Sequence, residues 1–577
     1  MAGRDSRRSA PVACFLLLLC VHTALDAALP AVALAAPRKR KRSAPPPPPP
    51  VAPAPAPTPL PPAPEPPQCP PCKEDKKDDG GDVVETIDET GASSGPKPLA
   101  PAPVAGAAAG KADAEKLQAR GFARLHGAVG YAREGFHPDR PDPLSPPFDV
   151  LAAGAQLYLA LGYARGRAFE AVVSGQAIYG VFEQDARIAE AWNGFNGFAT
   201  RTSFEGLLRE AFVRVGTGPF DLRVGQQRIA WGRSDGFAPN DILDARDLRD
   251  PFLSELELTH LPNFAVRADA DFGWGSLQLV GHPFFQPNRA DTYGSNWSIV
   301  QPDAPGPYRG LVNLAERMTD RTLHDQIQPL LGQSQVPDRD FSSISPGVRF
   351  AWTAGGVDVS HYYQYGYDHT PRLRIDPMFG QLIGMVDFAA LTPEQLTAIT
   401  TPFVVGPRPV TSEYLRRHHV GLDVQAVAGP MTLRLDAAYD SALVLYRRDL
   451  QGLAAPVVQA VAGAEYSGGE SGKVVNLEVA YVRVLDPIAP ASLLFYEANT
   501  FGVAGVMRWT FVGRLELQLR GTASLQPVGY SLQPQISWRL GDVWLRLGGV
   551  LLGGDLGSYG HYYRRNQAVY AMVKVDL

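Results

Sequence analysis

The sequence predicts an all-β protein, a transmembrane antiparallel β-barrel of about 18 strands preceded by a disordered Pro-rich segment. Three observations support this prediction. Apolar and polar residues alternate with a period of two, short connections alternate with long ones, and the polar face is charged on strand after strand. In residues 514–520, for example, three leucines share one face, and the other face carries Arg514, Glu516, Gln518 and Arg520.

The N-terminus has the pattern of an export signal. Arg4, Arg7 and Arg8 precede an apolar stretch at residues 11–21, and the small residues 33–36 supply an A-x-A cleavage pattern. The apolar stretch is shorter than the roughly 20 residues that a membrane-spanning helix needs. We therefore expect residues 1–36 to be a signal peptide.

Residues 37–116 have a composition that cannot build a core. Of the 53 prolines in the chain, 24 lie in residues 1–116, and the segment also contains the basic run 38–42. Such a stretch favours extended polyproline II or disorder. We expect a periplasmic tether whose basic run contacts a cell-wall polymer. Cys69 and Cys72 have C-x-x-C spacing, but no strand or helix pattern surrounds them, so we favour a local disulfide over a redox motif.

Residues 117–577 are expected to form the barrel. Predicted strands of about 10 to 14 residues exceed the roughly 5 to 6 of globular proteins and suit tilted membrane strands. Glycine-containing turns alternate with long loops at residues 232–261, 287–342 and 370–413. Charges on the inward face would be costly in a packed core but suit a wet lumen. These features favour a membrane barrel over a soluble sandwich.

Parity refines the strand number. A direct count gives about 17 segments, but both ends of a single-chain barrel normally lie on the short-turn side, which requires an even number. Residues 454–467 can supply the additional strand, giving about 18, with about 16 as the alternative. Residues 569–577 alternate like the C-terminal targeting strand of outer-membrane proteins and end in Leu577 instead of the usual phenylalanine.

One stretch carries a recognisable motif. Residues 222–232 read L-R-V-G-Q-Q-R-I-A-W-G and run into an Asp-rich loop. This resembles poorly characterised bacterial outer-membrane β-barrel proteins, porin-like, that have a G-x-Q-x-x-x-W-G strand motif followed by such a loop. The resemblance implies a porin-like or export-associated barrel. It points to Gly225, Gln227, Trp231, Gly232, Asp235, Asp241 and Asp247.

The Asp-rich loop allows more than one interpretation. Leu222 and Val224 suit a lipid-facing side, but Arg228 continues that face, so the strand either bulges or rises above the hydrocarbon. The loop is either a constriction folded into the pore or a cap held by its own ion pairs, and we favour the cap. Calcium binding through an Asp-x-x-Asp-x-x-Asp spacing is a third, weaker option. The lumen and constriction candidates are Arg228, Trp231, Asp235, Asp241, Asp244, Asp247, Arg267, Asp269, Arg434, Asp436, Arg514 and Glu516.

Other chemistry finds little support. All four cysteines lie in the first 72 residues, which excludes a disulfide framework or a Cys-ligated zinc module for the rest of the chain. His418 and His419 fall on opposite faces of a strand and cannot chelate one metal together. Residues 361–369 interleave tyrosines, as in an aromatic girdle or, less favoured, a sugar-stacking platform. With no catalytic grouping, no phosphate loop and a net charge of -5, we expect no enzyme, no cofactor, no metal and no nucleic-acid partner.

The predicted function follows from the wall charges, which nearly balance. Balanced wall charges suit the passage of small polar solutes. They are equally compatible with a lumen plugged by residues 287–342. We expect a porin-like channel or transporter in the bacterial outer membrane, contacting outer-membrane lipid and passing small polar solutes. The alternative is a structural or adhesive surface barrel with a plugged lumen and a wall-associating tether.

Overall fold

The computed structural model describes residues 115–130, 149–182, 204–252, 256–290, 297, 331–338, 340–386, 391–405, 409–468, 472–489, 492–511 and 513–577. The chain divides into two compact units, residues 1–90 and 91–577, and all described residues belong to the second. The predicted signal peptide and residues 37–114 of the predicted tether lie outside the described residues. The first strand begins at Glu115.

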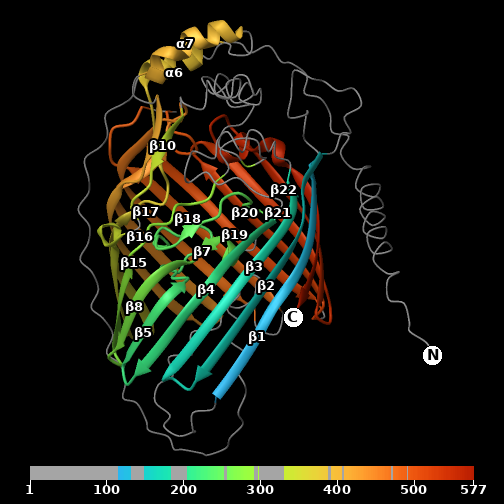
Figure 1. The fold of residues 1–577 in the computed structure, drawn as a ribbon. Helices are drawn as coiled ribbons and strands as arrows, with labels where there is room; N and C mark the ends of the chain where they lie inside the picture. The colour runs from blue at the N-terminus through green and yellow to red at the C-terminus, as the bar shows by residue number, and fades with distance from the viewer. Residues whose placement is uncertain are drawn as a thin grey trace, which may run out of the picture. The chain divides into compact units, whose positions relative to one another are not determined.

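Eighteen strands form one closed antiparallel barrel (Figure 1). Each strand pairs with the next along the chain, and β23 pairs with β1 to close the ring. The strands are β1 (Glu115–Gly130), β2 (Asp149–Arg165), β3 (Phe169–Phe182), β4 (Phe204–Thr217), β5 (Phe220–Gln227), β8 (Asn263–Asp271), β9 (Gly275–His282), β11 (Ser345–Ala354), β12 (Val357–Tyr367), β15 (Arg416–Ala428), β16 (Met431–Tyr446), β17 (Gly452–Ser467), β18 (Lys473–Val484), β19 (Asn499–Phe511), β20 (Leu515–Leu525), β21 (Val528–Leu540), β22 (Val543–Gly554) and β23 (Ala568–Asp576).

The predicted fold and strand number are confirmed. The strand that parity required is β17, Gly452–Ser467. The first and last strands of the barrel both have their chain ends on the short-turn side. Glu115 pairs with Arg165 beside one short turn, and Val575 pairs with Val543 beside another.

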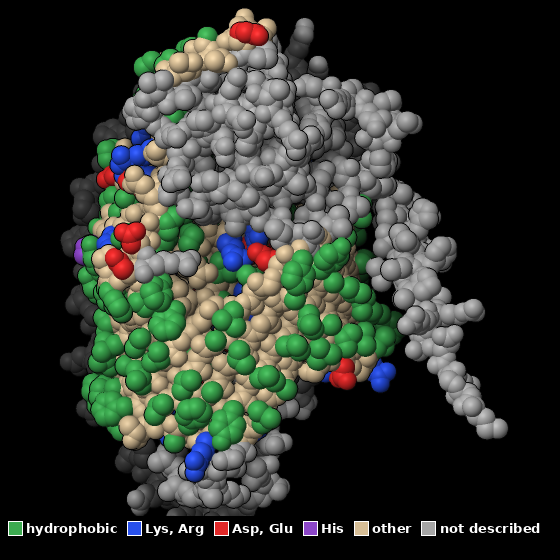
Figure 2. Space-filling model, in the orientation of Figure 1, with side chains coloured by type: hydrophobic (Ala, Val, Ile, Leu, Met, Phe, Trp, Pro, Cys, Tyr) green, Lys and Arg blue, Asp and Glu red, His purple; other side chains and the backbone are tan. Residues whose placement is uncertain are grey.

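Alternation places apolar side chains outside and polar ones inside. On β20, Leu515, Leu517 and Leu519 are 39%, 38% and 41% exposed, whereas the residues between them are half-buried. The same pattern recurs around the ring, and Figure 2 shows hydrophobic side chains spread over the outer surface of the strands. A strand meets two environments in this way because its side chains alternate across the sheet.

The connections at the two ends differ. At the short-turn end, Gly218 and Gly273 adopt φ values of 56° and 83°, which favour glycine. At the other end, the long connections contain a sheet of β10 (Leu331–Gln335), β13 (Arg372–Ile375) and β14 (Val410–Glu413). They also contain the short elements β6 (Ala245–Arg246), α3 (Leu256–Thr259), β7 (His260–Leu261), η2 (Phe341–Ser343), α8 (Tyr559–Tyr562) and η5 (Arg564–Asn566).

Two helices lie where the sequence indicated only a loop. They are α6 (Pro377–Met385) and α7 (Pro393–Val405). Asp376 caps α6, because its carboxylate accepts hydrogen bonds from the amides of Met378 and Phe379. None of the helices in the described ranges is both long and apolar enough to cross a membrane.

Candidate functional site

The chain leaves the barrel wall directly after β5 and returns at β8. Gln227 is completely buried, and its side-chain amide donates to the carbonyl of Ala265 at 3.0 Å. Gly225 has a φ of 131° and approaches the carbonyl oxygen of Ala211 so closely that a Cβ would lie 2.2 Å from it. The strand therefore ends here instead of continuing its outward face through Arg228. We call residues 228–262 the crossing loop.

The tip of the crossing loop reaches the far side of the lumen. Glu478 on β18 accepts hydrogen bonds from the amides of Asp235, Gly236 and Phe237, at 2.7, 2.9 and 3.0 Å. From β5 the ring runs through β8, β9, β11, β12, β15, β16 and β17 to β18, so β18 is the eighth strand along and β19 the ninth. In a ring of 18 strands the ninth is diametrically opposite.

A second wall carboxylate holds the residues before the tip. Asp436 on β16 accepts from the amides of Arg233 and Ser234 through the same oxygen, each at 3.0 Å. The amide of Gly232 donates to the hydroxyl of Tyr362 at 3.2 Å. Six consecutive backbone amides, residues 232–237, therefore donate to side chains of the wall.

Wall glycines give the loop room to approach. A Cβ on Gly502 of β19 would lie 2.9 Å from the ring of Phe237, and one on Gly421 of β15 would lie 2.1 Å from Asn240 Oδ1. Glycine at these two positions leaves space for the loop, because a larger residue would displace it. Asn240 is itself fixed, since its side-chain amide donates to the carbonyl of Leu422 at 3.1 Å.

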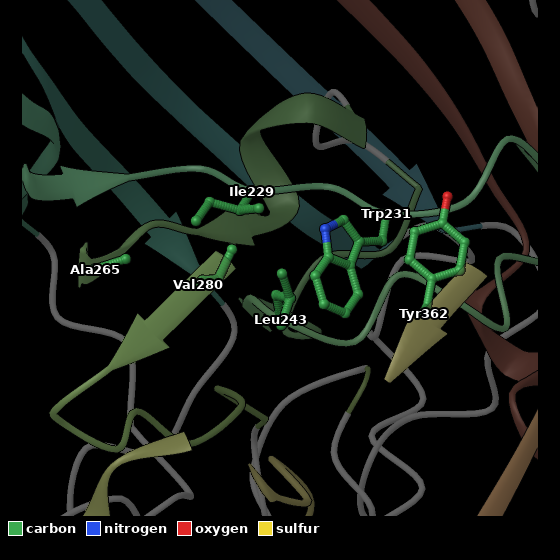
Figure 3. Close-up of a cluster of buried hydrophobic side chains, with 6 residues drawn as sticks. All are labelled: Ile229, Trp231, Leu243, Ala265, Val280 and Tyr362. Atoms are coloured by element: carbon green, nitrogen blue, oxygen red, sulfur yellow. The ribbon is translucent and has the colours of Figure 1, made fainter. Parts of the chain in front are cut away.

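An apolar cluster anchors the base of the loop (Figure 3). It consists of Ile229, Trp231, Leu243, Ala265, Val280 and Tyr362. The indole of Trp231 lies 5.1 Å from the ring of Tyr362, and its N–H donates to Gln278 Oε1 at 2.8 Å. The hydroxyl of Tyr362 in turn donates to the carboxylate of Asp423. Tyr362 is thus a lumenal residue and not part of an outer aromatic girdle.

Arginines complete the docking of the tip. Arg233 Nε lies 2.7 Å from Asp423 Oδ1 on β15. Arg434 on β16 bridges the loop to the wall, with Asp235 at 3.0 Å on one side and Glu465 at 2.7 Å on the other. The loop is therefore held both by its backbone and by charged side chains.

Within the loop, the aspartates have separate partners. Asp241 pairs with Arg246 at 2.7 Å, and Asp247 pairs with Arg249 at 2.6 Å. The expected self-neutralising ion pairs are thus present, but they accompany the wall contacts described above. Over the described parts of the chain, no group of three or more His, Cys, Asp or Glu side chains is arranged to hold a metal.

Asp244 differs from its neighbours because it is buried without a basic partner at hydrogen-bond distance. Its Oδ2 accepts from the amide of Ile229 at 2.8 Å, while Oδ1 has no hydrogen-bond partner among the described residues. Burial raises the pKa of the Asp244 carboxyl well above its ordinary value, and nearby Asp241 raises it further.

The remaining predicted site residues lie apart from the tip. Arg228 begins the crossing loop, with its amide 3.4 Å from Glu210 Oε1. Arg267 and Asp269 pair with each other on β8 at 2.7 Å. Glu516 lies half-buried on β20, whereas Arg514 is exposed in the turn before β20, outside the strand.

Glu478, Asp423, Tyr362 and Asn240 were not among the predicted site residues. For Asp423, one signal in the sequence could have indicated its role. Asp423 and Asp436 lie directly opposite each other on β15 and β16, and like charges in that position destabilise a sheet unless other groups supply donors. A facing pair of acids on the inner wall therefore indicates that something basic or amide-rich docks there.

Comparison with known proteins gives a family and several structural likenesses. The family model described as "Protein of unknown function (DUF1302)" matches residues 149–543. No curated protein matches the chain. The barrel is similar to Pseudomonas aeruginosa OccK8 (OprE), with a TM-score of 0.41, 8% identity, and coverage of 79% of this chain and 97% of that one.

Two further solved structures are similar at the same level. Pseudomonas aeruginosa OccK2 (OpdF) in complex with glucuronate has a TM-score of 0.40 at 9% identity, covering 80% of this chain and 97% of that one. A BenF-like porin from Pseudomonas fluorescens Pf-5 has a TM-score of 0.40 at 8% identity, covering 80% and 98%. Likeness at these scores supports no inference about substrate.

Proposed function

This chain belongs to the DUF1302 family of proteins of unknown function, and that family assigns it no activity. We propose a function from the structure of the barrel lumen. The protein is a porin-like channel of the bacterial outer membrane, and small polar solutes pass beside the crossing loop. The observation that carries this proposal is a loop that spans the lumen from β5 to β19 and is fixed by wall carboxylates.

The outer surface supports a membrane location. A closed barrel satisfies all of its strand hydrogen bonds internally, as a span through lipid requires. Aromatic side chains gather toward the two ends of the strands, as at a membrane interface. Trp274 and Phe272 lie at the short-turn end, and Tyr363 and Tyr365 lie toward the long loops.

The wall between the loop tip and the closing strands supports the choice of small polar solutes. On β20, β21 and β23 it carries neutral hydrogen-bonding groups, and Gln518, Gln535 and Tyr570 form a connected chain. Basic side chains lie there as well, with Arg508 on β19, Arg520 on β20, Arg546 on β22 and Lys574 on β23, beside the acidic Glu516 on β20. Such a surface offers hydrogen-bond donors and acceptors to polar solutes and carries more basic than acidic side chains.

Planar-bilayer recording and liposome swelling test the proposal. Refolded full-length protein, checked for folding by heat-modifiable migration, is expected to give discrete conductance steps and to admit neutral sugars below a size limit. The variant Glu478→Gln, which weakens the hydrogen bonds to the loop tip, is measured in the same two assays. If folded wild type and folded Glu478→Gln both pass neither ions nor sugars, the channel function is wrong.

The same recordings address a second candidate, a structural or adhesive barrel whose lumen is plugged. The many bonds between loop and wall favour it. A silent wild type beside a conducting Glu478→Gln would support a plugged barrel. For this candidate, the basic run at residues 38–42 would attach the barrel to an anionic cell-wall polymer, which a sedimentation assay with purified wall material tests.

A further inference from the structure

A cluster of aromatic and basic side chains lies on the outer surface, at the long-loop end of β12 and β15. It consists of Tyr363, Tyr365 and Tyr367 from β12 and Arg416 and His418 from β15. We call it the outer-face cluster. In the antiparallel register Tyr365 lies directly opposite His418, and Tyr367 directly opposite Arg416.

The guanidinium of Arg416 lies over the rings of two of the tyrosines. Its Cζ lies 4.3 Å from the ring centroid of Tyr367 and 5.2 Å from that of Tyr365. Nη1 and Nη2 donate to the carbonyl oxygens of Ile344 and Ser342, at 3.0 and 2.7 Å. These contacts orient the group without neutralising it, because both acceptors are uncharged.

No carboxylate of the described residues forms an ion pair with Arg416. Arginines in the lumen behave differently, since Arg233 pairs with Asp423 and Arg434 pairs with Asp235 and Glu465. A guanidinium has five N–H donors, and two nitrogens of Arg416 face carbonyls. The remaining donors and the positive charge are available to an acceptor outside the protein.

His418 extends the same surface. Its ring stacks on Tyr365 with centroids 4.7 Å apart, and its Nδ1 lies 3.0 Å from the hydroxyl of Tyr363. This contact fixes the ring and leaves Nε2 on the exposed side chain for an external partner. Arg416 and His418 therefore lie two residues apart on the outer face of β15, and both contact tyrosine rings of β12.

Below the cluster the surface is apolar. Val420, the next outward residue of β15, is 50% exposed, and Leu435 on β16, opposite Val424 and further toward the short-turn end, is 41% exposed. A hydrogen-bonding cation at the rim above an apolar strip matches an amphiphile with an anionic head and hydrocarbon chains. A soluble anion would use the cation but not the apolar strip.

We infer that the outer-face cluster binds the phosphate of a lipid headgroup in the leaflet that faces the long loops. Arginine at a membrane interface is stabilised by such groups, whereas an unpaired charge facing hydrocarbon is costly. Bidentate arginine contacts also suit phosphate geometry. The inference rests on the membrane location proposed above, but it concerns the outer face and not the lumen.

Native mass spectrometry of the detergent-solubilised full-length protein tests this inference. The probes are lipid A with both phosphates, dephosphorylated lipid A, and inorganic phosphate. Wild type is expected to bind the phosphorylated lipid at least about tenfold more tightly than the dephosphorylated one. The double variant Arg416→Gln/His418→Gln is expected to lose that difference.

The matched control is Lys473→Gln. Lys473 also places a cation over an aromatic ring, 4.4 Å from the centroid of Trp509, but at the opposite end of the barrel. It is expected to bind phosphorylated lipid A like wild type. Tyr367→Leu removes one of the tyrosine rings under Arg416 and leaves both basic groups, and it is expected to weaken lipid binding. It provides an independent test if the double variant does not fold.

Three results would overturn the inference. They are equal binding of the two forms of lipid A, a folded double variant within twofold of wild type, and full competition by millimolar inorganic phosphate, which would indicate a soluble-anion site. Conductance is expected to be unchanged in the double variant, because neither residue faces the lumen. Loss of the lipid preference with intact conductance, or the reverse, therefore separates this inference from the proposed channel function.

Discussion

Glu478 Oε2 accepts a hydrogen bond at 2.9 Å from the backbone amide of Gly236, a residue 242 positions earlier in the chain. The same carboxylate accepts from the amides of Asp235 and Phe237. Three amides on one buried carboxylate form a charge-assisted contact, and each such bond is worth about 1.5 to 3 kcal/mol when a charged group takes part. This contact fixes the tip of the crossing loop against the wall opposite β5.

Glu478→Gln is expected to weaken this contact while preserving side-chain shape. The amide retains one acceptor oxygen but loses the negative charge, and its NH2 faces backbone donors. We expect docking of the loop to become less favourable by roughly 2 kcal/mol. Single-channel recordings should then show larger or more frequently fluctuating conductance than wild type.

Glu516→Gln is the matched control, because Glu516 also faces the lumen, from β20, and the loop amides hydrogen-bond to Glu478 and Asp436 instead. Its recordings are expected to keep the gating pattern of wild type. If both substitutions change gating equally, the effect comes from wall charge and not from the docking of the loop.

Gly502→Ala is expected to dislodge the loop by a steric route. The new Cβ would lie 2.9 Å from the ring of Phe237, so the ring has to move, at a cost of about 1 to 3 kcal/mol. Gly505→Ala on the same strand is the control, since its nearest neighbour would be 3.4 Å away. Urea titration followed by heat-modifiable migration measures both. A second substitution, Phe237→Leu, should restore stability to Gly502→Ala if the clash is the cause.

Asp244 is expected to make the folded protein less stable as the pH rises. Its pKa is about 3.9 in an unfolded chain, and burial raises the pKa in the folded protein. Its contribution to stability is therefore complete below about pH 4 and is lost as the pH rises through the folded pKa. Asp244→Asn, which is neutral at every pH, should raise the urea midpoint at pH 8 and converge with wild type near pH 4.

Asp247→Asn provides the opposite expectation in the same loop. Asp247 pairs at 2.6 Å with Arg249, which is buried, so removing the carboxylate leaves a less compensated charge. We expect a loss of about 3 kcal/mol at neutral pH. A lower midpoint for Asp244→Asn than for wild type at pH 8 would contradict the raised pKa of Asp244.

The sequence predicted the strands because each strand carries its own pattern. Alternation in residues 514–520 is local, and parity led to β17 although its alternation is weak. The motif also led to Trp231 and Asp235. Their partners Gln278 and Glu478 could not be predicted, because those contacts depend on the path of a loop whose residues show no periodicity. Helix α6 was missed, although Asp376 before Pro377 is a recognisable start signal.

The path of the crossing loop can be tested directly with cysteines. An ideal Cβ on Gly236 would lie 2.5 Å from the Cβ of Ala504 on β19, so a retreat of about 1 Å brings the pair to the spacing of a disulfide. Gly236→Cys/Ala504→Cys, made with Cys69 and Cys72 replaced by serine, should cross-link on mild oxidation. Gly236→Cys/Gly505→Cys should not, because residue 505 points to the outer face. Mass spectrometry after proteolysis identifies the linked peptides, and failure of the first pair in folded protein would show that the loop does not cross the lumen.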